Sequence, residues 1–226
     1  MTQRRPIIAI DGPAGSGKST VAKFVAKKLG LFYIDTGAMY RALALKARQS
    51  KVDPQDQKGI IELAKNLNVD LCYDAVTGKL SVFLDAQDVS EEIRKPSITE
   101  HVSTIAKIKE VREQMVILQR RLAAGKKAIL EGRDIATVVF PDAYKKFYLD
   151  AAPKERIKRR YLELKEKEEH IQLSAVEQDI QHRDKTDTTR EHAPLKRAPD
   201  AIYIDTSQLS IEEVVERILK EIQKTP

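Results

Sequence analysis

Cysteine, tryptophan and long apolar runs are almost or wholly missing from this sequence. Among 226 residues there is one cysteine, Cys72, and no tryptophan. A single cysteine cannot form an internal disulfide, and it excludes a zinc site built from several cysteines. No apolar run approaches the ~20 residues that a membrane-spanning helix needs. Residues 1–6 also lack the apolar segment of a secretory signal peptide, so we expect a cytoplasmic protein with no membrane partner.

Aromatic residues are scarce, at 5% of the chain, whereas charged residues make up 33%. The 40 Lys and Arg residues outnumber the 34 Asp and Glu residues, which gives a net charge of +6. Such an excess is typical of proteins that bind nucleic acid or small anionic ligands. Few aromatic side chains leave few platforms on which the bases of a single strand could stack. A basic nucleic-acid-binding ATPase is therefore kept only as an alternative from a different functional class.

The most informative stretch, Gly12 to Thr20, reads GPAGSGKST. It fits the pattern G-x-x-x-x-G-K-S/T, and it lies between an apolar run over residues 6–11 and a helical pattern that begins near Lys18. In this strand–loop–helix setting the pattern binds the phosphates of a nucleoside triphosphate. Lys18 can reach the β- and γ-phosphates, and the Ser19 hydroxyl can ligate Mg²⁺. The residues expected to contact ATP are Gly12, Pro13, Ala14, Gly15, Ser16, Gly17, Lys18, Ser19 and Thr20.

Short apolar runs recur along the chain and predict buried strands. Besides residues 6–11, they cover residues 31–34, 128–130, 146–150 and 201–205. Helical patterns separate most of them, which is typical of an α/β fold. In open α/β sheets, ligands bind beyond the carboxyl ends of the strands. The charged residues that directly follow residues 128–130 are therefore candidates for binding.

An antiparallel hairpin interrupts this alternation of strands and helices. Apolar and polar residues alternate over residues 69–73 and again over residues 80–84, and a turn lies between them. Val89 is expected to begin a short third strand. A meander of this kind inside an otherwise βα chain is typical of an inserted subdomain.

Several helices are expected around this hairpin. One covers residues 38–48, with Tyr40 and Arg41 in its first turn, and another opens at Asp53. Residues 96–100 predict a capping box at the start of a further helix. A cation such as Arg41 is disfavoured near a helix N-terminus unless an anion lies beside it. The alternative is a solvated surface arginine.

A strongly charged segment, residues 154–191, lies between the last two predicted strands. It opens with five cations in the seven positions 154–160. Arg183, Asp187 and Arg190 would share one face if the segment is helical. A solvated helical pair held by ion pairs is one interpretation. The other is a mobile cover that closes over phosphates, because a transferring phosphoryl group needs charge stabilisation and exclusion of water.

Four stretches together resemble the bacterial cytidylate kinases. They are GPAGSGKST at 12–20, DTGAMYR at 35–41, EGRDIATVVFP at 131–141 and the segment 183–194. The first is shared by many nucleotide-binding proteins, whereas the Gly-Arg-Asp stretch is far more specific. Ala136 departs from the family's pattern, in which glycine is expected. The resemblance covers essentially the whole chain, and it implies transfer of the γ-phosphate of ATP to CMP and dCMP.

The resemblance also implies a fold. We expect a single kinase domain over residues 1–226 with a P-loop nucleoside-triphosphatase-like core built on a five-stranded parallel sheet. The core would comprise residues 1–36, 113–152 and 191–226. A nucleoside-monophosphate-binding subdomain, with a small antiparallel sheet plus helices, would cover residues 37–112, and a helical lid would cover residues 153–190. Family resemblance further favours a monomer.

Roles for individual residues follow from the same resemblance. Those expected to hold the CMP phosphate are Thr36, Arg41, Arg133 and Arg190, and those expected to read cytosine are Ser103, Arg112 and Asp134. Those expected to hold the sugar are Arg183 and Asp187. The expected catalytic set is Lys18, Arg133, Arg156, Arg159 and Arg160, and the match does not decide which lid arginine contacts ATP. By spacing alone, Ser103 and Arg112 read as ordinary surface residues.

No general-base motif is present, and a phosphate acceptor needs none, because its second pKa of about 6 leaves it ionised at pH 7. Arginines and Mg²⁺ would offset the repulsion between two anions. Glu131 is a candidate outer-shell partner of the Mg²⁺, and an ion pair with a nearby arginine is the alternative. The nearest alternative function is a related kinase acting on UMP, AMP or a non-nucleotide alcohol. An alcohol acceptor would require a carboxylate base facing it.

Overall fold

The computed structural model describes residues 5–166 and 171–224. Residues 1–4 and 225–226 of the predicted core and residues 167–170 of the predicted lid therefore lie outside the described part of the chain. No helix of the described part is long and apolar enough to cross a membrane.

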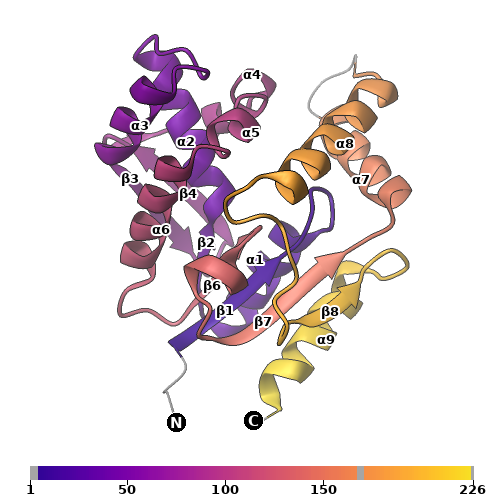
Figure 1. Ribbon diagram of the computed structural model, residues 1–226. Helices are drawn as coiled ribbons and strands as arrows, with labels where there is room; N and C mark the ends of the chain where they lie inside the picture. Colours follow the sequence, from indigo (N-terminus) through magenta and orange to yellow (C-terminus); the bar gives the residue numbers. More distant parts are fainter. Residues whose placement is uncertain (1–4, 167–170, 225–226) are drawn as a thin grey trace.

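A five-stranded parallel sheet forms the centre of the molecule (Figure 1). Its strands are β1 (Arg5–Asp11), β2 (Phe32–Asp35), β6 (Ala128–Gly132), β7 (Ala143–Asp150) and β8 (Ile202–Asp205), in the order β2-β6-β1-β7-β8. Every neighbouring pair is parallel. The side chains of Ile10, Ile34 and Phe147 are fully buried. The predicted α/β fold is thus confirmed, because the apolar runs of the sequence coincide with the strands.

Helices pack along the sheet. α1 (Lys18–Leu29) and α9 (Ile211–Gln223) contact each other, and α6 (Lys109–Ala123) contacts β2. α9 begins with a capping box, in which the Ser210 hydroxyl accepts from the Glu213 N–H and the Glu213 carboxylate accepts from the Ser210 N–H. Its apolar face, which includes Val214 and Ile218, is buried in the core.

The chain forms the predicted inserted subdomain between β2 and α6. Its small antiparallel sheet consists of β3 (Val69–Asp74), β4 (Lys79–Leu84) and β5 (Gln87–Asp88), in the order β3-β4-β5. Val69 and Leu71 are buried opposite Leu84 and Val82, so the predicted alternation is confirmed. The third strand ends just before Val89, which was expected to begin it.

Two helix starts of the subdomain differ from the prediction. α2 (Thr36–Gln49) begins two residues early, because the Asp35 carboxylate accepts from the Ala38 N–H at 2.8 Å and caps the helix. Arg41 consequently lies beyond the first turn. α3 (Gln57–Lys65) begins later than Asp53, because Asp56 is its capping residue.

The capping box predicted at residues 96–100 is wrong. Pro96 occupies the first position of α4 (Pro96–Thr99), and the Ser97 hydroxyl accepts from Arg48 at 3.2 Å instead of capping the helix. The predicted single helix is divided into α4 and α5 (Val102–Ile105), which follow a short 3₁₀ turn, η1 (Glu92–Arg94).

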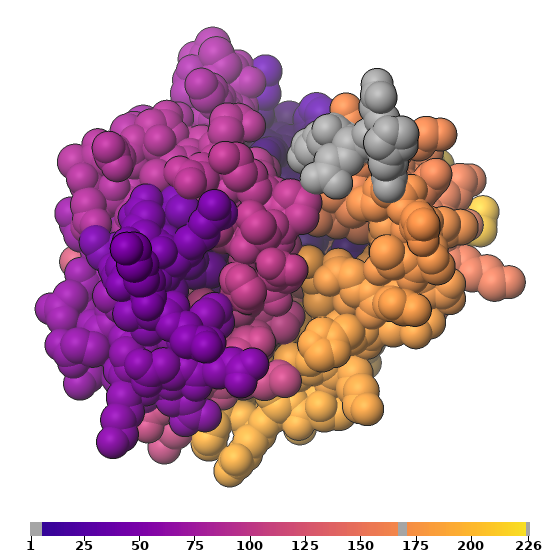
Figure 2. Space-filling model, turned by 90° about the horizontal axis from the view of Figure 1, so that it is seen from above, coloured from indigo at the N-terminus to yellow at the C-terminus, as the bar shows by residue number. Residues whose placement is uncertain are grey.

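Two helices, α7 (Pro153–Lys165) and α8 (Leu173–Thr189), stand across from the subdomain and correspond to the predicted lid (Figure 1). The surface is hollowed between the purple and magenta subdomain and the orange lid (Figure 2). α8 ends at Thr189, and Arg190 has an extended backbone. The helical face predicted for Arg183, Asp187 and Arg190 therefore holds only for the first two.

Candidate active site

The glycine loop connects β1 to α1 and is pressed against its neighbours. Gly12 has a φ of 156°, and a Cβ there would lie 2.0 Å from the Leu149 carbonyl oxygen of β7. Gly15 has a φ of 75°, and its Cβ would lie 2.8 Å from the Arg156 carbonyl oxygen. Gly17 is the N-cap residue of α1 and supplies no capping side chain. The first N–H groups of α1 thus lack a side-chain cap, as in helices that bind anions at their N-termini.

Lys18 lies under this loop with 6% of its surface exposed. Its Nζ donates to the Pro13 carbonyl at 3.0 Å. Burial, followed by the nearby Arg133 cation, lowers the pKa of Lys18 to about 7. A phosphate beside the amine would favour its charged form. The Lys18 amine can therefore leave the Pro13 carbonyl and bind an anion instead. Ser19 and Thr20, next along the helix, are exposed.

The charged residues at the end of β6 meet α8 next to Lys18. Arg133 Nε donates to the Asp187 carboxylate at 2.7 Å, and Arg190 Nη1 donates to its other oxygen at 3.4 Å. These two cations hold the pKa of Asp187 below its usual range despite burial. Arg190 Nη2 is buried and has no hydrogen-bond partner among the described residues. The arrangement leaves guanidinium donors available for an anion.

Glu131 is buried on β6, and the Tyr33 hydroxyl donates to its carboxylate at 2.9 Å. The hydrogen-bond partner of the Glu131 carboxylate is thus a tyrosine and not the arginine of the predicted alternative. Thr36, also buried, donates its hydroxyl proton to the Glu131 carbonyl at 2.7 Å. Arg41 pairs with Asp35 at 2.9 Å and is partly exposed. The Asp35 carboxylate explains how a cation is tolerated near this helix start.

The proposed cytosine readers Arg112 and Asp134 form a buried ion pair. Arg112 Nη2 and the Asp134 carboxylate are 2.5 Å apart, and the two side chains are 6% and 8% exposed. Arg112 Nη1 donates to the Ala106 carbonyl at 3.2 Å, and its guanidinium lies 5.7 Å from the centre of the Tyr40 ring. The expectation from spacing that Arg112 is a surface residue is wrong. Ser103, on α5, is half-buried.

The lid arginines differ in what they contact. Arg156 is buried and donates to the Ala151 carbonyl, the Ala14 carbonyl of the glycine loop and the Asp184 carboxylate. The contacts of the other residues are Arg159 with Thr206, Arg160 with Glu163, and Arg183 with Asp179. Arg160 Nε is buried and has no hydrogen-bond partner in the described part of the chain. Burial lowers the pKa of Arg183, and the nearby Arg160 and Arg133 cations lower it further, so three guanidinium groups lie near one another.

Sequence reasoning missed three residues that organise this site. Asp11, at the end of β1, accepts from the N–H groups of Ile135 and Ala136 in the short π-helical turn η2 (Ile135–Val139). Tyr33 binds Glu131, and Asp184 binds Arg156. The sequence signal of Asp11 is a polar residue at a strand end and that of Asp184 a carboxylate within the charged segment, whereas Tyr33 lies inside a strand; none of these signals names a partner.

The sequence profile described as cytidylate kinase matches residues 8–224. The chain belongs to the cytidylate kinase family. The cytidylate kinase of Caldicellulosiruptor bescii is 47% identical over 213 residues, which cover 94% of this chain and 93% of that protein. The cytidylate kinase of Caldanaerobacter subterraneus is 50% identical over 217 residues, which cover 96% and 94%. Membership of this family makes the protein a phosphotransferase.

One solved structure is similar in fold alone. An uncharacterized protein from Eubacterium ventriosum has a TM-score of 0.51 at 13% identity, over 97% of this chain and 99% of that one.

Ala136 is the one departure from the cytidylate kinase pattern noted in the sequence. It is buried, its N–H donates to Asp11 at 2.8 Å, and it is not among the residues with positive φ. The backbone at this position does not require glycine, and the extra methyl group is accommodated.

Proposed function

We propose that the enzyme transfers the γ-phosphate of ATP to CMP and dCMP, giving ADP and CDP or dCDP. The observation that carries this proposal is the buried pair of Arg112 and Asp134 beside Tyr40. An ionised carboxylate can only accept hydrogen bonds, and a guanidinium can only donate them. Cytosine presents an amino donor beside a ring-nitrogen acceptor, which matches this pair. Uracil presents a carbonyl acceptor and an N–H donor at those positions.

The phosphates would lie between the glycine loop and the guanidinium groups of Arg133 and Arg190. The donor phosphates would occupy the uncapped N-terminus of α1. There the Lys18 amine would stay close to the phosphoryl group during its transfer and stabilise its charge. The acceptor is already an anion, so the residues have to overcome repulsion and exclude water instead of removing a proton. Arg160, with its unpartnered Nε, is the lid residue we expect to contact the phosphoryl groups first.

Mg²⁺ would enter with ATP and supply charge neutralisation at its phosphates. The described residues contain no group of three or more His, Cys, Asp or Glu side chains able to hold a metal. This fits a cation held by phosphate oxygens, waters and one or two protein groups. The exposed Ser19 hydroxyl would bind it directly, and Glu131, oriented by Tyr33, would act through water.

We further expect the enzyme to act as a monomer in the cytoplasm, without nucleic acid. Arg112, Arg160 and Arg190 each have a buried guanidinium nitrogen without a hydrogen-bond partner among the described residues, whereas a nucleic-acid groove needs exposed cations and stacking aromatics. A steep dependence of DNA or RNA binding on salt would instead favour the nucleic-acid-binding ATPase.

The proposed function is tested by measuring ADP release with CMP, dCMP, UMP, AMP and single-stranded DNA as separate additions. CMP and dCMP should give the highest kcat/KM. Release stimulated equally by UMP, or by DNA alone, would contradict the proposal.

The cytosine assignment is tested separately with Asp134→Asn. Asn introduces a donor that uracil can accept, so the CMP/UMP ratio of kcat/KM should fall at least roughly tenfold, the scale of one unpaired buried polar group. Asp53→Asn, an exposed carboxylate in the turn before α3, is the matched control. If Asp134 only braces its neighbours, both substrates will lose activity in proportion and the ratio will stay unchanged.

A further inference from the structure

The Arg41 side chain is held in one orientation at the start of α2. Its Nη2 donates to the Asp35 carboxylate at 2.9 Å, and this is the one ion pair of Asp35 among the described residues. The guanidinium folds back over Gly37, because a Cβ there would lie 3.2 Å from Arg41 Nη1 and 3.2 Å from Asp35 Oδ1. Gly37 is not among the residues with positive φ. The glycine therefore provides room for the ion pair and not a special backbone conformation.

Asp35 uses both oxygens of its carboxylate in this arrangement. One accepts from the Ala38 N–H at 2.8 Å and caps α2, and the other accepts from Arg41. Burial raises the pKa of Asp35, but the Arg41 cation and the Ala38 N–H oppose that rise and hold the pKa below its usual range. The carboxylate cannot turn away from Arg41 without giving up the cap, so the cap fixes the ion pair.

The ion pair lies at the edge of the sheet where phosphates are expected. β2 ends at Asp35, which is opposite Glu131 of β6, and ligands of open α/β sheets bind beyond these strand ends. Burial lowers the pKa of Lys18, and Asp35 is near enough to oppose that fall. Arg41 is thus on the same side as the glycine loop. A guanidinium has five N–H donors, so donors remain for a phosphate when Nη2 binds Asp35.

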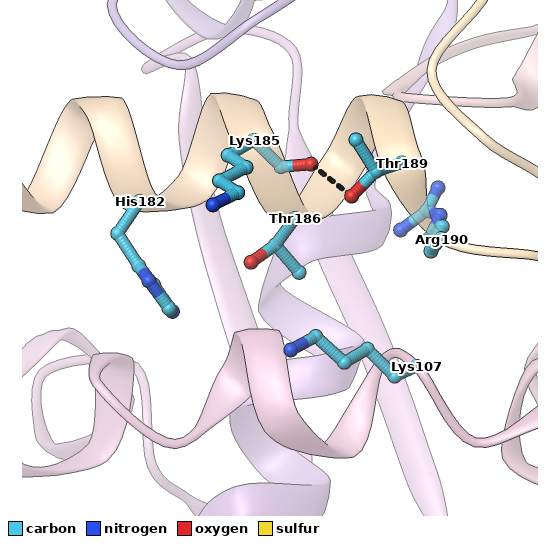
Figure 3. Close-up of a pocket in the computed structure, with 6 residues that line it drawn as sticks. All are labelled: Lys107, His182, Lys185, Thr186, Thr189 and Arg190. Carbon is cyan, nitrogen blue, oxygen red and sulfur yellow. Dashed lines mark hydrogen bonds between the residues drawn. The ribbon is translucent and has the colours of Figure 1, made fainter.

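The other arginines expected to hold the monophosphate are fixed in a different way. Arg190 lies at the end of the lid helix α8 (Figure 3), and it shares the Asp187 carboxylate with Arg133. Because Arg133 follows β6 and Asp187 belongs to α8, the geometry of these arginines depends on where the lid lies. Asp35 and Arg41 are six positions apart at one helix start. Their geometry is set before the lid moves.

We propose that Asp35 is a positioning residue of the monophosphate site, which holds the Arg41 guanidinium ready for the phosphate of the incoming nucleotide. The inference rests on the proposed function, since it takes CMP as the acceptor. A guanidinium that is already fixed loses less side-chain freedom when it binds. Asp35 would therefore set how tightly the phosphate is held, and it would take no part in the choice between cytosine and uracil.

Asp35→Asn separates positioning from capping, because Asn caps helices about as well as Asp. Its amide oxygen can still accept from Ala38, so the fold should persist, which the thermal midpoint checks. The neutral side chain no longer holds the Arg41 cation by a charge-assisted hydrogen bond. The Kd of CMP, measured by calorimetry without ATP, should rise about two- to tenfold, the scale of ordering one long side chain on binding.

Two comparisons show whether this change is specific to the phosphate. The CMP/UMP ratio of kcat/KM should stay unchanged in Asp35→Asn, whereas Asp134→Asn should lower it. Asp56→Asn is the matched control, because Asp56 caps α3 by accepting from the Gly59 N–H at 3.1 Å. It makes the same substitution at the cap of another helix and should leave the Kd of CMP as in the wild type.

A double-mutant cycle with Arg41→Ala shows whether Asp35 acts through Arg41. Without the guanidinium there is nothing to position, so Asp35→Asn should no longer raise the Kd of CMP in this background. The Lys18 amine, which Asp35 also influences, is present in both backgrounds. Its contribution to the effect of Asp35→Asn is therefore common to both arms of the cycle.

Unchanged or tighter binding of CMP by Asp35→Asn would overturn the proposal, because it would show that the carboxylate only neutralises Arg41 or competes with the phosphate. An equal rise in Kd in both backgrounds would also overturn it, since Asp35 would then act without Arg41. Wild-type affinity in Arg41→Ala would remove Arg41 from the site. Failure of the proposed function is a different result, because it appears in the wild type as absence of turnover with CMP.

Discussion

Asp11 is a residue whose charge depends strongly on the fold around it. Its carboxylate is 1% exposed, and both oxygens accept backbone N–H groups, at 2.9 Å from Ile135 and 2.8 Å from Ala136. It therefore ties the end of β1, just before the glycine loop, to the turn that follows the proposed base reader Asp134. Burial raises the pKa of Asp11 to about 7, with Asp134 raising it further and Arg133 and the two N–H groups opposing the rise.

This raised pKa predicts how the effect of Asp11→Asn on stability depends on pH. An unfolded Asp has a pKa near 3.9, so between about pH 4 and pH 7 the folded protein binds the proton more tightly than the unfolded chain does. Relative to the variant, which has no such group, the wild type gains stability as the pH falls through 7 and loses it as the pH rises. As the pH falls from about 7 to about 4, the free energy of unfolding of the wild type relative to the variant should increase by up to about 1.4 kcal/mol per pH unit.

Urea unfolding of both proteins at pH 8 and pH 5 measures this difference. Lys18, whose pKa is also near 7, is present in both proteins and cancels in the comparison. A cost of substitution that is the same at both pH values, or larger at pH 8, would mean that Asp11 is ionised throughout this range.

At the scale of elements, Arg156 joins three parts of the molecule. It lies on α7 and is 5% exposed. Its guanidinium donates hydrogen bonds to the Ala14 carbonyl of the glycine loop, at 3.1 Å, and to the Asp184 carboxylate of α8, at 2.6 Å. The guanidinium fork makes contacts in several directions, which a lysine ammonium on a flexible stem cannot reproduce together. Arg156 thus fixes the glycine loop relative to both lid helices.

Arg156→Lys should therefore act on the loop more than on the chemical step. We expect the KM for ATP to rise several-fold, because the glycine loop loses the contact that fixes it, and the KM for CMP to change less. The thermal midpoint should fall, because the partly buried Asp184 carboxylate loses its partner. Arg121→Lys, at an exposed position of α6, is the control. A fall in kcat with KM for ATP and the thermal midpoint unchanged would instead place Arg156 on the transferring phosphate.

The elements themselves were predictable to different degrees. Buried strands such as β6 follow from apolar runs, because a parallel strand covered on both faces needs them. The glycine loop and the helix after it were predictable, because the pattern G-x-x-x-x-G-K-S/T after a strand is typical of this structure. Helix starts were less predictable, since several residues competed to cap the chain: Asp56 took the place of Asp53, and Pro96 displaced the capping box expected at Ser97.

At the scale of the whole molecule, the candidate site is made of pairs that are far apart in the sequence. Arg133 meets Asp187 across 54 positions, and Arg112 meets Asp134 across 22. Resemblance to a family gave these residues roles, but spacing alone placed Arg112 on the surface. The partner of a charged residue depends on tertiary packing, which local patterns do not encode. Asp184 and Tyr33 were missed for the same reason.

The hollow between subdomain and lid is expected to close when ligands bind on both of its sides. In the free enzyme no phosphate balances the charge of the lid cations, and the Arg160 and Arg133 guanidinium groups repel that of Arg183. A ligand that carries phosphates to both sides of the hollow should relieve this repulsion and hold the lid helices against the core. ATP alone fills only one side and should do so less.

Amide hydrogen exchange is the measurement, because it reports local opening of each helix separately. With a bisubstrate ligand, amides of α7 and α8 should exchange at least roughly tenfold more slowly than in the free enzyme, whereas ATP alone should give a smaller protection. α9, which packs on α1 away from the hollow, serves as the internal control and should change little. Equal exchange of α7 and α8 with and without ligand would show that these helices are a fixed part of the core. Equal protection of α9 would show instead that the ligand stabilises the whole fold without closing a lid.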